Sequence, residues 1–439
     1  MAMTRSFSSL LKNSSCPKNT ISQSVFDGSL PSMNTILTAF GFAILSLQVQ
    51  AQSPKGYRFS KEISASIDTE KVAWNLQEYA IQFSRVGNYR ASLDIQKEFL
   101  ARTSRQRNAL VKPKVDSLYF SSFRPIPAVA AITAEASKFQ VVITNEAHYQ
   151  PQNRVFTSLL LDSLYKKGFR YFCPESLSNT DPEMGLTKDT ALNRRKYPIL
   201  NEGYYIDEPR YGDLIRRALQ IGYTVLAYEH IGRDIKDPGE RFMARERGQA
   251  DNIAHILEKD PSARILVHCG YGHLNEQVRD SVGLMAAMLK LYHHIDPLTV
   301  DQQDMLEENG DTSYSRTNLE EPSVFIAGSK YFADSNANHI VDLVVYFPRT
   351  KYINGRPNWL VYDKKNKYAW VGAIPGDFTY PLMLLAYHAE EDRSVAVPAD
   401  IIEWQHSNEK IAFVLTKGDY VIEIKDMNGH RQLKKLSVK

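Results

Sequence analysis

The stretch that decides the fold is Val141-Val-Ile-Thr-Asn-Glu-Ala-His148. Four apolar or β-branched residues are followed at once by two ionisable side chains, Glu146 and His148. Residues 152–167 then carry apolar residues at helical spacing and end before Gly168, which predicts a helix. Glu146 and His148 therefore lie in a strand-to-helix loop. In an open α/β sheet, such loops at the carboxyl ends of strands collect ligands and chemistry.

Strand-like and helix-like runs alternate on both sides of this stretch, from about residue 131 to 350. The strand-like runs are 139–144, 169–172, 223–228, 264–267, 323–327 and 341–347, with 298–300 as a weaker candidate. The helix-like runs are 152–167, 212–221, about 239–259, and 277–292. This alternation predicts an α/β fold, with a mainly parallel sheet and helices on both faces. Right-handed crossovers then bring the carboxyl ends of the strands to one edge.

The segments before and after this domain do not continue the alternation of strands and helices. Residues 52–130 are predicted to form a helical lead-in, with Gly87 in a turn like that of a tetratricopeptide hairpin. Residues 351–439 are predicted to be a small β-rich appendage, with a hairpin over 359–371 and a meander over 411–438. The expected organisation is therefore an α/β domain over 131–350 between a helical and a β-rich segment.

Charge and hydropathy restrict the expected location and partners. The chain of 439 residues has 53 basic and 50 acidic side chains, a net charge of +3 that indicates neither nucleic acid nor a membrane surface as partner. The apolar run 36–49, ending in Val49-Gln50-Ala51, predicts a signal peptide over 1–51 and export to the periplasm or the outside. Met33 is an alternative start, with 1–32 an over-called extension. No window after residue 60 is apolar enough to span a bilayer.

Ionisable side chains recur at the ends of successive predicted strands. Glu146 and His148 follow the first strand, Glu175 the second and His273 the fourth, while Arg245 opens the helix after the third. A histidine beside carboxylates is held in one tautomer and tuned as a base near neutral pH. An arginine nearby neutralises a developing oxyanion. We therefore expect these five residues to form the catalytic group.

A second set of residues is expected to bind the substrate around this group. Residues 201–210 form a loop rich in tyrosine, acid and arginine, which fits a lid over a pocket as well as an ordinary surface loop. The residues expected on the substrate side are Glu246, His268, Tyr205, Glu208 and Arg210. The expected partner is a small molecule or a peptide.

Water is the expected nucleophile, because the chain has no Gly-x-Ser-x-Gly elbow and its later cysteines stand in no nucleophile motif. Those cysteines, Cys173 and Cys269, end the second and fourth predicted strands. In the common strand order 3-2-1-4 the first strand separates them, which puts their Cα atoms about 9–10 Å apart. A disulfide needs less than about 7 Å, so both thiols are expected to be free.

The order of these motifs resembles the superfamily of erythromycin esterases, ChaN-like haem-binding lipoproteins and TraB/Tiki proteins. The similarity covers roughly 135–295 and rests on Asn145-Glu-Ala-His148, Glu175, Arg245-Glu-Arg-Gly-Gln-Ala-Asp-Asn252 and Gly270-Tyr-Gly-His273. The family's first motif is Gly-Glu-x-x-His, whereas here Asn145 replaces the glycine and His148 lies two residues after Glu146. In the esterase helix motif, Glu246 replaces an aspartate and Gln249 a methionine.

The resemblance implies a hydrolase of an ester or amide. It also leaves two alternatives with a cofactor: a haem- or iron-binding protein, or a peptidase dependent on a divalent metal. The candidate metal ligands are Glu146, His148, Glu175 and His273.

Overall fold

The computed structural model describes residues 56–67, 74–106, 120–278, 282–307, 318–333, 340–374 and 376–439. The expected signal peptide over 1–51, and the alternative start at Met33, lie outside the described residues. Among the helices within these ranges, none is long and apolar enough to cross a membrane.

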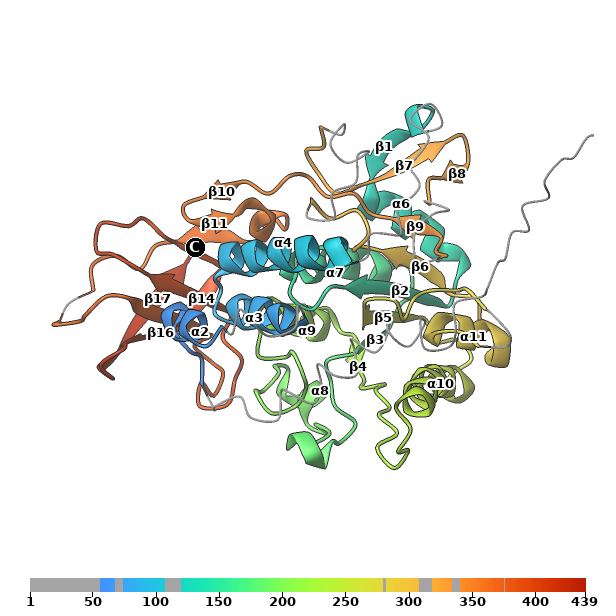
Figure 1. Ribbon diagram of the computed structural model, residues 1–439, viewed down its shortest axis with the longest axis horizontal. Coiled ribbons are helices and arrows are strands. Elements are labelled where there is room, and N and C mark those ends of the chain that lie inside the picture. Colours follow the sequence, from blue (N-terminus) through green and yellow to red (C-terminus); the bar gives the residue numbers. More distant parts are fainter. Residues whose placement is uncertain are drawn as a thin grey trace, which may run out of the picture. The chain divides into compact units, whose positions relative to one another are not determined.

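A parallel sheet of six strands lies at the centre of the fold, in the order β4-β3-β5-β2-β6-β9 (Figure 1). Its strands are β2 (Val141–Glu146), β3 (Tyr171–Pro174), β4 (Thr224–Val225), β5 (Ile265–Gly270), β6 (Leu298–Asp301) and β9 (Leu343–Val344). β2 and β5 are fully buried, as their nearly continuous apolar sequences require of strands covered on both faces. The expected parallel sheet is confirmed.

Alternate residues of the strands face two different hydrophobic clusters. Val142 belongs to the cluster with α6 (Ala128–Glu135), α7 (Pro151–Lys166) and α9 (Pro209–Ile221). Val141 belongs to the cluster with α10 (Pro238–Lys259) and α11 (Met285–His293). The helices therefore cover both faces of the sheet.

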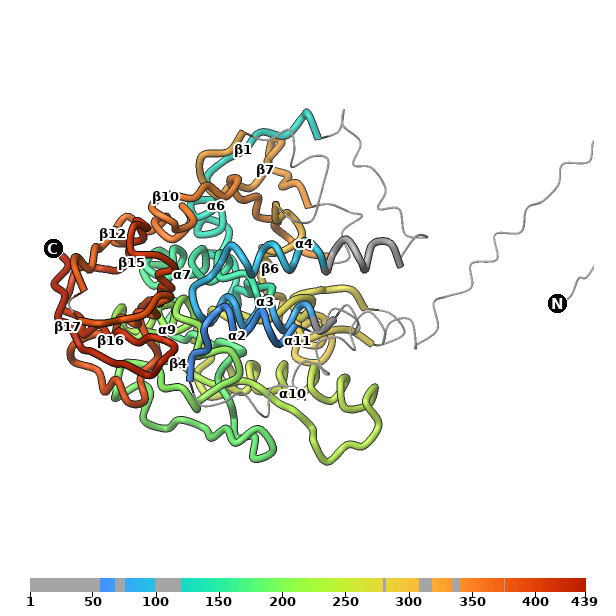
Figure 2. The backbone as a smooth tube through the Cα atoms, turned by 60° about the vertical axis from the view of Figure 1, so that its left-hand side comes forward, coloured from blue at the N-terminus to red at the C-terminus, as the bar shows by residue number. Residues whose placement is uncertain are grey.

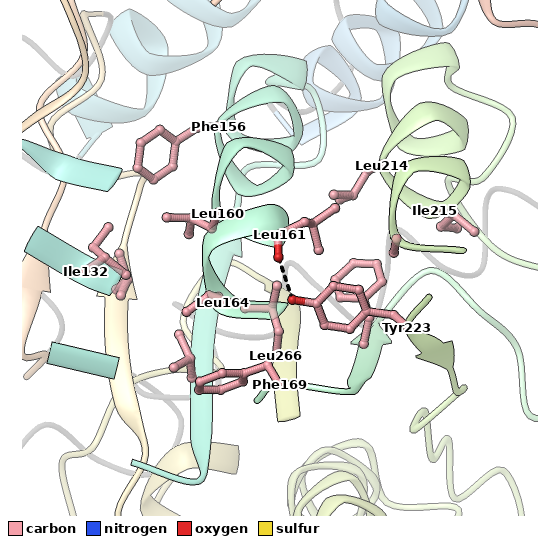
Figure 3. Close-up of a cluster of buried hydrophobic side chains, with 14 of the residues drawn as sticks. Ile132, Phe156, Leu160, Leu161, Leu164, Phe169, Leu214, Ile215, Tyr223 and Leu266 are labelled. Carbon is pink, nitrogen blue, oxygen red and sulfur yellow. Dashed lines mark hydrogen bonds between the residues drawn. The ribbon is translucent and has the colours of Figure 1, made fainter. Parts of the chain in front are cut away.

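Figure 3 shows the first of these clusters, where leucines of α7 meet α9 and the sheet. Leu160, Leu161 and Leu164 are fully buried there, and each buried leucine contributes about 1.5–3 kcal/mol of transfer free energy. The Tyr223 hydroxyl, also in this cluster, donates to the Leu161 carbonyl at 2.8 Å. These contacts fix α7, the helix that follows β2, and therefore also the loop between β2 and α7.

The N-terminal part contains α2 (Ser60–Ala65), α3 (Trp74–Arg85) and α4 (Tyr89–Gln106), and α3 and α4 run side by side (Figures 1 and 2). Gly87 lies in the turn between α3 and α4 with a φ of +71°. A Cβ there would lie 2.1 Å from the carbonyl oxygen of Ile401, so the turn requires glycine for both reasons. The short helices are α8 (Leu192–Arg195), η2 (Ala136–Lys138), η3 (Pro182–Met184) and η6 (Asn358–Val361).

The C-terminal region contains an antiparallel sheet of four strands in the order β14-β13-β16-β17. These are β13 (Leu382–His388), β14 (Asp400–Trp404), β16 (Gly418–Asp426) and β17 (Arg431–Val438). The smaller antiparallel groups are β1 (Arg124–Pro127) with β7 (Ser323–Ala327) and β8 (Lys330–Tyr331), β10 (Tyr352–Ile353) with β11 (Arg356–Pro357), and β12 (Lys367–Ala369) with β15 (Phe413–Leu415).

Both flanks contribute to one hydrophobic cluster. Phe59, Phe83 and Val86 from the N-terminal helices pack with Met383 and Leu385 of β13. The helical segment and the β-rich segment therefore share a hydrophobic core, so the β-rich segment packs against the rest of the chain.

Several expected strands are wrong in their partners. The run 323–327 is a strand, but it pairs antiparallel with β1 and β8 instead of joining the parallel sheet. The expected hairpin over 359–371 is absent from the described part of that region, since 358–361 is a 3₁₀ helix and β12 pairs with β15. The weak candidate at 298–300 is a member of the parallel sheet.

The expected order of strands is also wrong, although its consequence for the cysteines is correct. β3 and β5, which carry Cys173 and Cys269, are direct neighbours, with Cys173 level with Val267. Cys269 lies two residues further along, so strand spacing and rise put the two Cα atoms about 8 Å apart. This exceeds the reach of a disulfide, and both thiols are free and buried. Burial raises the pKa of the Cys173 thiol to about 12.

Candidate functional site

The carboxyl ends of three neighbouring strands lie level at one edge of the parallel sheet. The register of β2 with β5 pairs Glu146 with Gly270, and that of β3 with β5 pairs Pro174 with His268. Glu175 follows at once, and its N–H donates to the carbonyl of His268 at 2.9 Å. The sheet therefore brings together the strand ends on which the sequence places the ionisable residues.

The first group of charges, the Arg154 network, contains Arg154, Glu146, Glu208, His148 and His268. Arg154 lies in the first turn of α7 and donates to the two oxygens of Glu146 at 2.6 and 2.8 Å, and to Glu208 at 2.8 Å. The Nδ1 of His148 and the Nε2 of His268 each lie 3.0 Å from the Glu146 carboxylate. Glu146 thus accepts bonds from three side chains and is fully engaged.

The second group, the Arg245 network, contains Arg245, Glu175, Glu229, Glu246 and His273. Arg245 donates to Glu229 at 3.0 and 2.6 Å and to Glu175 at 2.5 Å. Its Nη1 lies 3.0 Å from the Nε2 of His273, whose Nδ1 lies 2.8 Å from Glu246. Glu246 therefore orients this imidazole, while Glu175 is 3.5 Å from its Nε2.

The imidazole of His148 is held between two tyrosine rings. Tyr205 stacks on one face with ring centroids 4.0 Å apart, and Tyr271 meets it edge-on at 4.7 Å. With Nδ1 on Glu146, the remaining ring nitrogen, Nε2, lies on the edge that faces Gly270. The ring therefore has a fixed position and a fixed orientation.

The two networks meet at Gly270. A Cβ at this position would lie 2.4 Å from Cε1 of His148 and 2.9 Å from Oε2 of Glu175. The N–H of Gly270 also donates to the Glu175 carboxylate. Any side chain at residue 270 would therefore push His148 and Glu175 out of place, and the glycine allows their close approach.

The residues of the cluster differ slightly in the surface that they retain. His148 and His273 retain 4% of their surface, and Glu175 and Arg245 retain 5%. Their partners are deeper, with Glu146 at 1% and Arg154, His268 and Glu246 at 0%. All eight residues are buried, and the first four retain slightly more surface than the partners that hydrogen-bond to them.

Charge pairing sets the protonation of the cluster. Burial alone would raise the pKa of Glu146, but the Arg154 charge and its hydrogen bonds, with those of His148 and His268, hold this pKa well below its usual range. Burial likewise opposes ionisation of Glu175, yet the charges of His273 and Arg245 lower its pKa to about 2. Both carboxylates are therefore ionised at neutral pH.

His273 differs because two carboxylates face it. Burial lowers its pKa, the charges of Glu246 and Glu175 raise it, and that of Arg245 lowers it, with a net rise above the ordinary value. This imidazole therefore gains a proton more readily than a histidine in water.

The five residues expected to bind the substrate have four different positions. Tyr205 lies at the site, against His148. His268 and Glu246 lie beneath it as hydrogen-bond partners of Glu146 and His273. Glu208 is buried, caps α9 by accepting from the N–H of Tyr211, and supports Arg154.

Arg210, the remaining residue of that set, does not join the cluster. Its guanidinium pairs with Asp213 at 3.0 Å and with Asp400 of β14 at 3.4 Å. Because Arg210 stands two residues into α9 after the Glu208 cap, its side chain projects from the helix toward the C-terminal sheet. It connects the α/β domain to the β-rich region.

Three residues of the site, Arg154, Glu229 and Tyr271, belong to neither the predicted catalytic set nor the predicted substrate-binding set. Arg154 is fully buried, yet its position in a helix with an apolar stripe resembles that of a solvated residue. Tyr271 lies within the quoted Gly-Tyr-Gly-His motif without being assigned a function. A signal for Arg154 exists in the spacing, since it stands eight residues after a carboxylate that needs a cation.

The candidate metal ligands do not form a ligand group. Within the described ranges there is no set of three or more histidine, cysteine, aspartate or glutamate side chains placed to hold a metal ion. The Glu146 carboxylate is occupied by Arg154, and the His148 ring is stacked on Tyr205 and meets Tyr271 edge-on. Metal and haem binding remain predictions from the resemblance, with no residue arrangement to favour them.

Comparisons with known proteins give no family. No family model matches the chain, and no curated protein does. Among solved structures there is a match to the type III effector HopBA1, at 13% identity and a TM-score of 0.30, over 52% of this chain and 96% of that one. A similarity at this level carries no conclusion about function.

Proposed function

We propose that the protein is a hydrolase of an ester or amide, with water activated by His148. The observation that carries this proposal is the position of that imidazole. Its Nδ1 lies 3.0 Å from the ionised Glu146, so this nitrogen donates and Nε2 keeps its lone pair. The ring is fixed by Tyr205 and Tyr271 and retains 4% of its surface. These are the properties of a general base.

The reaction proceeds through a tetrahedral intermediate. His148 Nε2 takes a proton from water as the water oxygen forms a bond to the carbonyl carbon, and the carbonyl π electrons move to its oxygen. When the carbonyl re-forms, the bond to the alcohol or amine breaks, and the leaving group takes the proton from His148. The products are a carboxylic acid and an alcohol or amine, and the base is regenerated.

Arg245 supplies positive charge for the oxyanion, and His273 lies beside it. Arg245 retains 5% exposure and His273 4%, and the two nitrogens that face each other are 3.0 Å apart. A guanidinium nitrogen only donates, so the Nε2 of His273 accepts from Arg245 and its lone pair is not free to take a proton from water. We therefore propose His148 as the base, whereas the sequence alone leaves both histidines open.

The motif order supports the same reading. Glu146, His148, Glu175, Arg245 and His273 stand at one sheet edge, in the order in which the erythromycin esterase superfamily carries its motifs. Membership of that superfamily, and export of the protein, are part of the proposal.

Panels of esters and of peptides, followed by proton release, test the proposal. The mature chain is compared with His148→Ala, His273→Ala and the double variant. We expect hydrolysis of at least one class by the wild type, and a loss of about 10²- to 10⁴-fold in His148→Ala. Activity no higher than that of the double variant on every substrate would contradict the proposal.

A further inference from the structure

The N-terminal helical hairpin, α3 and α4, touches the loop that carries His148. Ala80 and Ile81 of α3 pack with Ala147 and Tyr149 on either side of the histidine. The Ser92 hydroxyl of α4 lies 3.2 Å from the carbonyl oxygen of Tyr149. A segment outside the α/β domain therefore covers the catalytic loop.

The same hairpin also holds the loop that carries Tyr205. Arg85, the last residue of α3, pairs with Asp207 at 3.0 Å and donates to the Tyr204 carbonyl at 3.3 Å. This loop ends at Glu208, so the hairpin fixes the chain on both sides of the tyrosine that stacks on His148.

A continuous series of hydrogen bonds leads from the hairpin to the catalytic histidine. The Tyr89 hydroxyl donates to Oε1 of Glu208 at 3.2 Å, and Oε2 of Glu208 accepts from Arg154 at 2.8 Å. Arg154 then holds Glu146, and Glu146 holds Nδ1 of His148. Every side chain in this series is buried.

The hydroxyl of Tyr89 acts as a donor in this series. Burial, and next the charge of Glu208, raise the pKa of Tyr89 well above its ordinary value, so its proton stays in place. The donated bond stabilises the Glu208 charge. Arg154 is divided between Glu208 and Glu146, so a Glu208 without this donor competes more strongly for the guanidinium and loosens its bonds to Glu146.

We propose that Tyr89 is a positioning residue for His148, acting through Glu208, Arg154 and Glu146. The proposal rests on the hydrolase function for its effect on rate, but its effect on the histidine is independent of any substrate. It makes the helical hairpin part of the catalytic unit, although the resemblance to known hydrolases begins only near residue 135.

The test compares Tyr89→Phe with Tyr79→Phe. The first variant keeps the ring, which packs against Trp359 with centroids 5.1 Å apart, and removes only the hydroxyl. The second removes a hydroxyl of the same hairpin that bonds to the Ser66 carbonyl at 2.5 Å and has no link to the series. The measurements are kcat and KM on the ester or amide found by the panels, and the ¹⁵N resonances of the His148 imidazole, which report which nitrogen carries the proton.

We expect Tyr89→Phe to lower kcat about three- to tenfold with KM nearly unchanged, the effect of one lost hydrogen bond. We also expect the ¹⁵N resonance of His148 Nδ1 to move from its wild-type position, because a Glu146 less engaged by Arg154 accepts more strongly from this nitrogen, and we expect Tyr79→Phe to leave both measurements as in the wild type. Wild-type resonances of His148 in Tyr89→Phe would overturn the inference, as would equal effects of the two variants. If the wild type hydrolyses nothing, the proposed function fails and the resonances alone decide this inference.

Discussion

The Nδ1 of His148 lies 3.0 Å from Oε1 of Glu146, on a carboxylate that Arg154 holds with two further bonds. This relationship determines which imidazole nitrogen is free. An ionised carboxylate accepts from Nδ1, and Nε2, on the edge of the ring that faces Gly270, then keeps its lone pair. The account of the site depends on this pair more than on any other contact.

The meeting point of the two networks gives the first prediction. Gly270→Ala places a methyl group 2.4 Å from the His148 ring, so we expect hydrolysis to fall by about 10²-fold, the effect of an ångström of misplacement. Gly328→Ala is the control, since Gly328 has a φ of +61° and nothing within 4 Å of an added Cβ. It is expected to lose stability through backbone strain but to keep its activity. Full activity in Gly270→Ala would show that His148 and Glu175 do not act at their observed positions.

The buried guanidinium of Arg154 gives the second prediction. Arg154→Met leaves Glu146 and Glu208 without their cation, and we expect the free energy of unfolding in urea to fall by about 3–5 kcal/mol. Adding Glu208→Gln removes one of the two uncompensated charges and should restore part of this loss.

Arg247→Met is the matched control for that experiment. Its pair with Asp251 is 2.8 Å long but lies at the surface, where such a pair contributes about 0.5 kcal/mol or less. A loss in Arg154→Met no larger than in this control would mean that Arg154 is not the cation on which Glu146 depends.

The pH dependence of stability gives the third prediction. Against the opposing effect of burial, His273 and Arg245 lower the folded-state pKa of Glu175 to about 2, whereas an unfolded glutamate titrates near about 4.3. A lowered folded pKa contributes stability that is fully present above about pH 4.3 and is lost as the pH falls toward 2. The difference in melting temperature between the wild type and Glu175→Gln should therefore be larger at pH 6 than at pH 3. A difference that grows on acidification would contradict the assigned charge.

The edge of the sheet on which the site lies could be predicted because it depends on local patterns. Apolar runs followed by Glu146, Glu175 and His273 mark strand ends, and a parallel sheet places such ends together. The order of the strands could not be predicted, since a crossover helix can return the chain to either side of a strand. The neighbouring positions of β3 and β5 follow from packing that no local pattern encodes.

The missing parts of the prediction depend on contacts distant in sequence. Arg154 looks like a surface residue until Glu208, 54 positions later, is placed beside it. β12 pairs with β15, which follows β13 and β14 in the sequence. The hairpin predicted over 359–371 from local turn residues is therefore wrong. The N-terminal hairpin contributes through the bond between Tyr89 and Glu208, which are 119 positions apart in the sequence. No local motif predicts a contact over that separation.

The most direct test of the central claim, that His148 is the general base, is rescue of His148→Ala by imidazole in solution. Removal of the side chain leaves a space between Tyr205 and Tyr271 that has the shape of the lost ring. The account predicts that His148→Ala hydrolyses the substrate about 10²- to 10⁴-fold more slowly than the wild type, and that imidazole restores its rate in a saturable manner. A rate in His148→Ala equal to that of the wild type, with no response to imidazole, would contradict it.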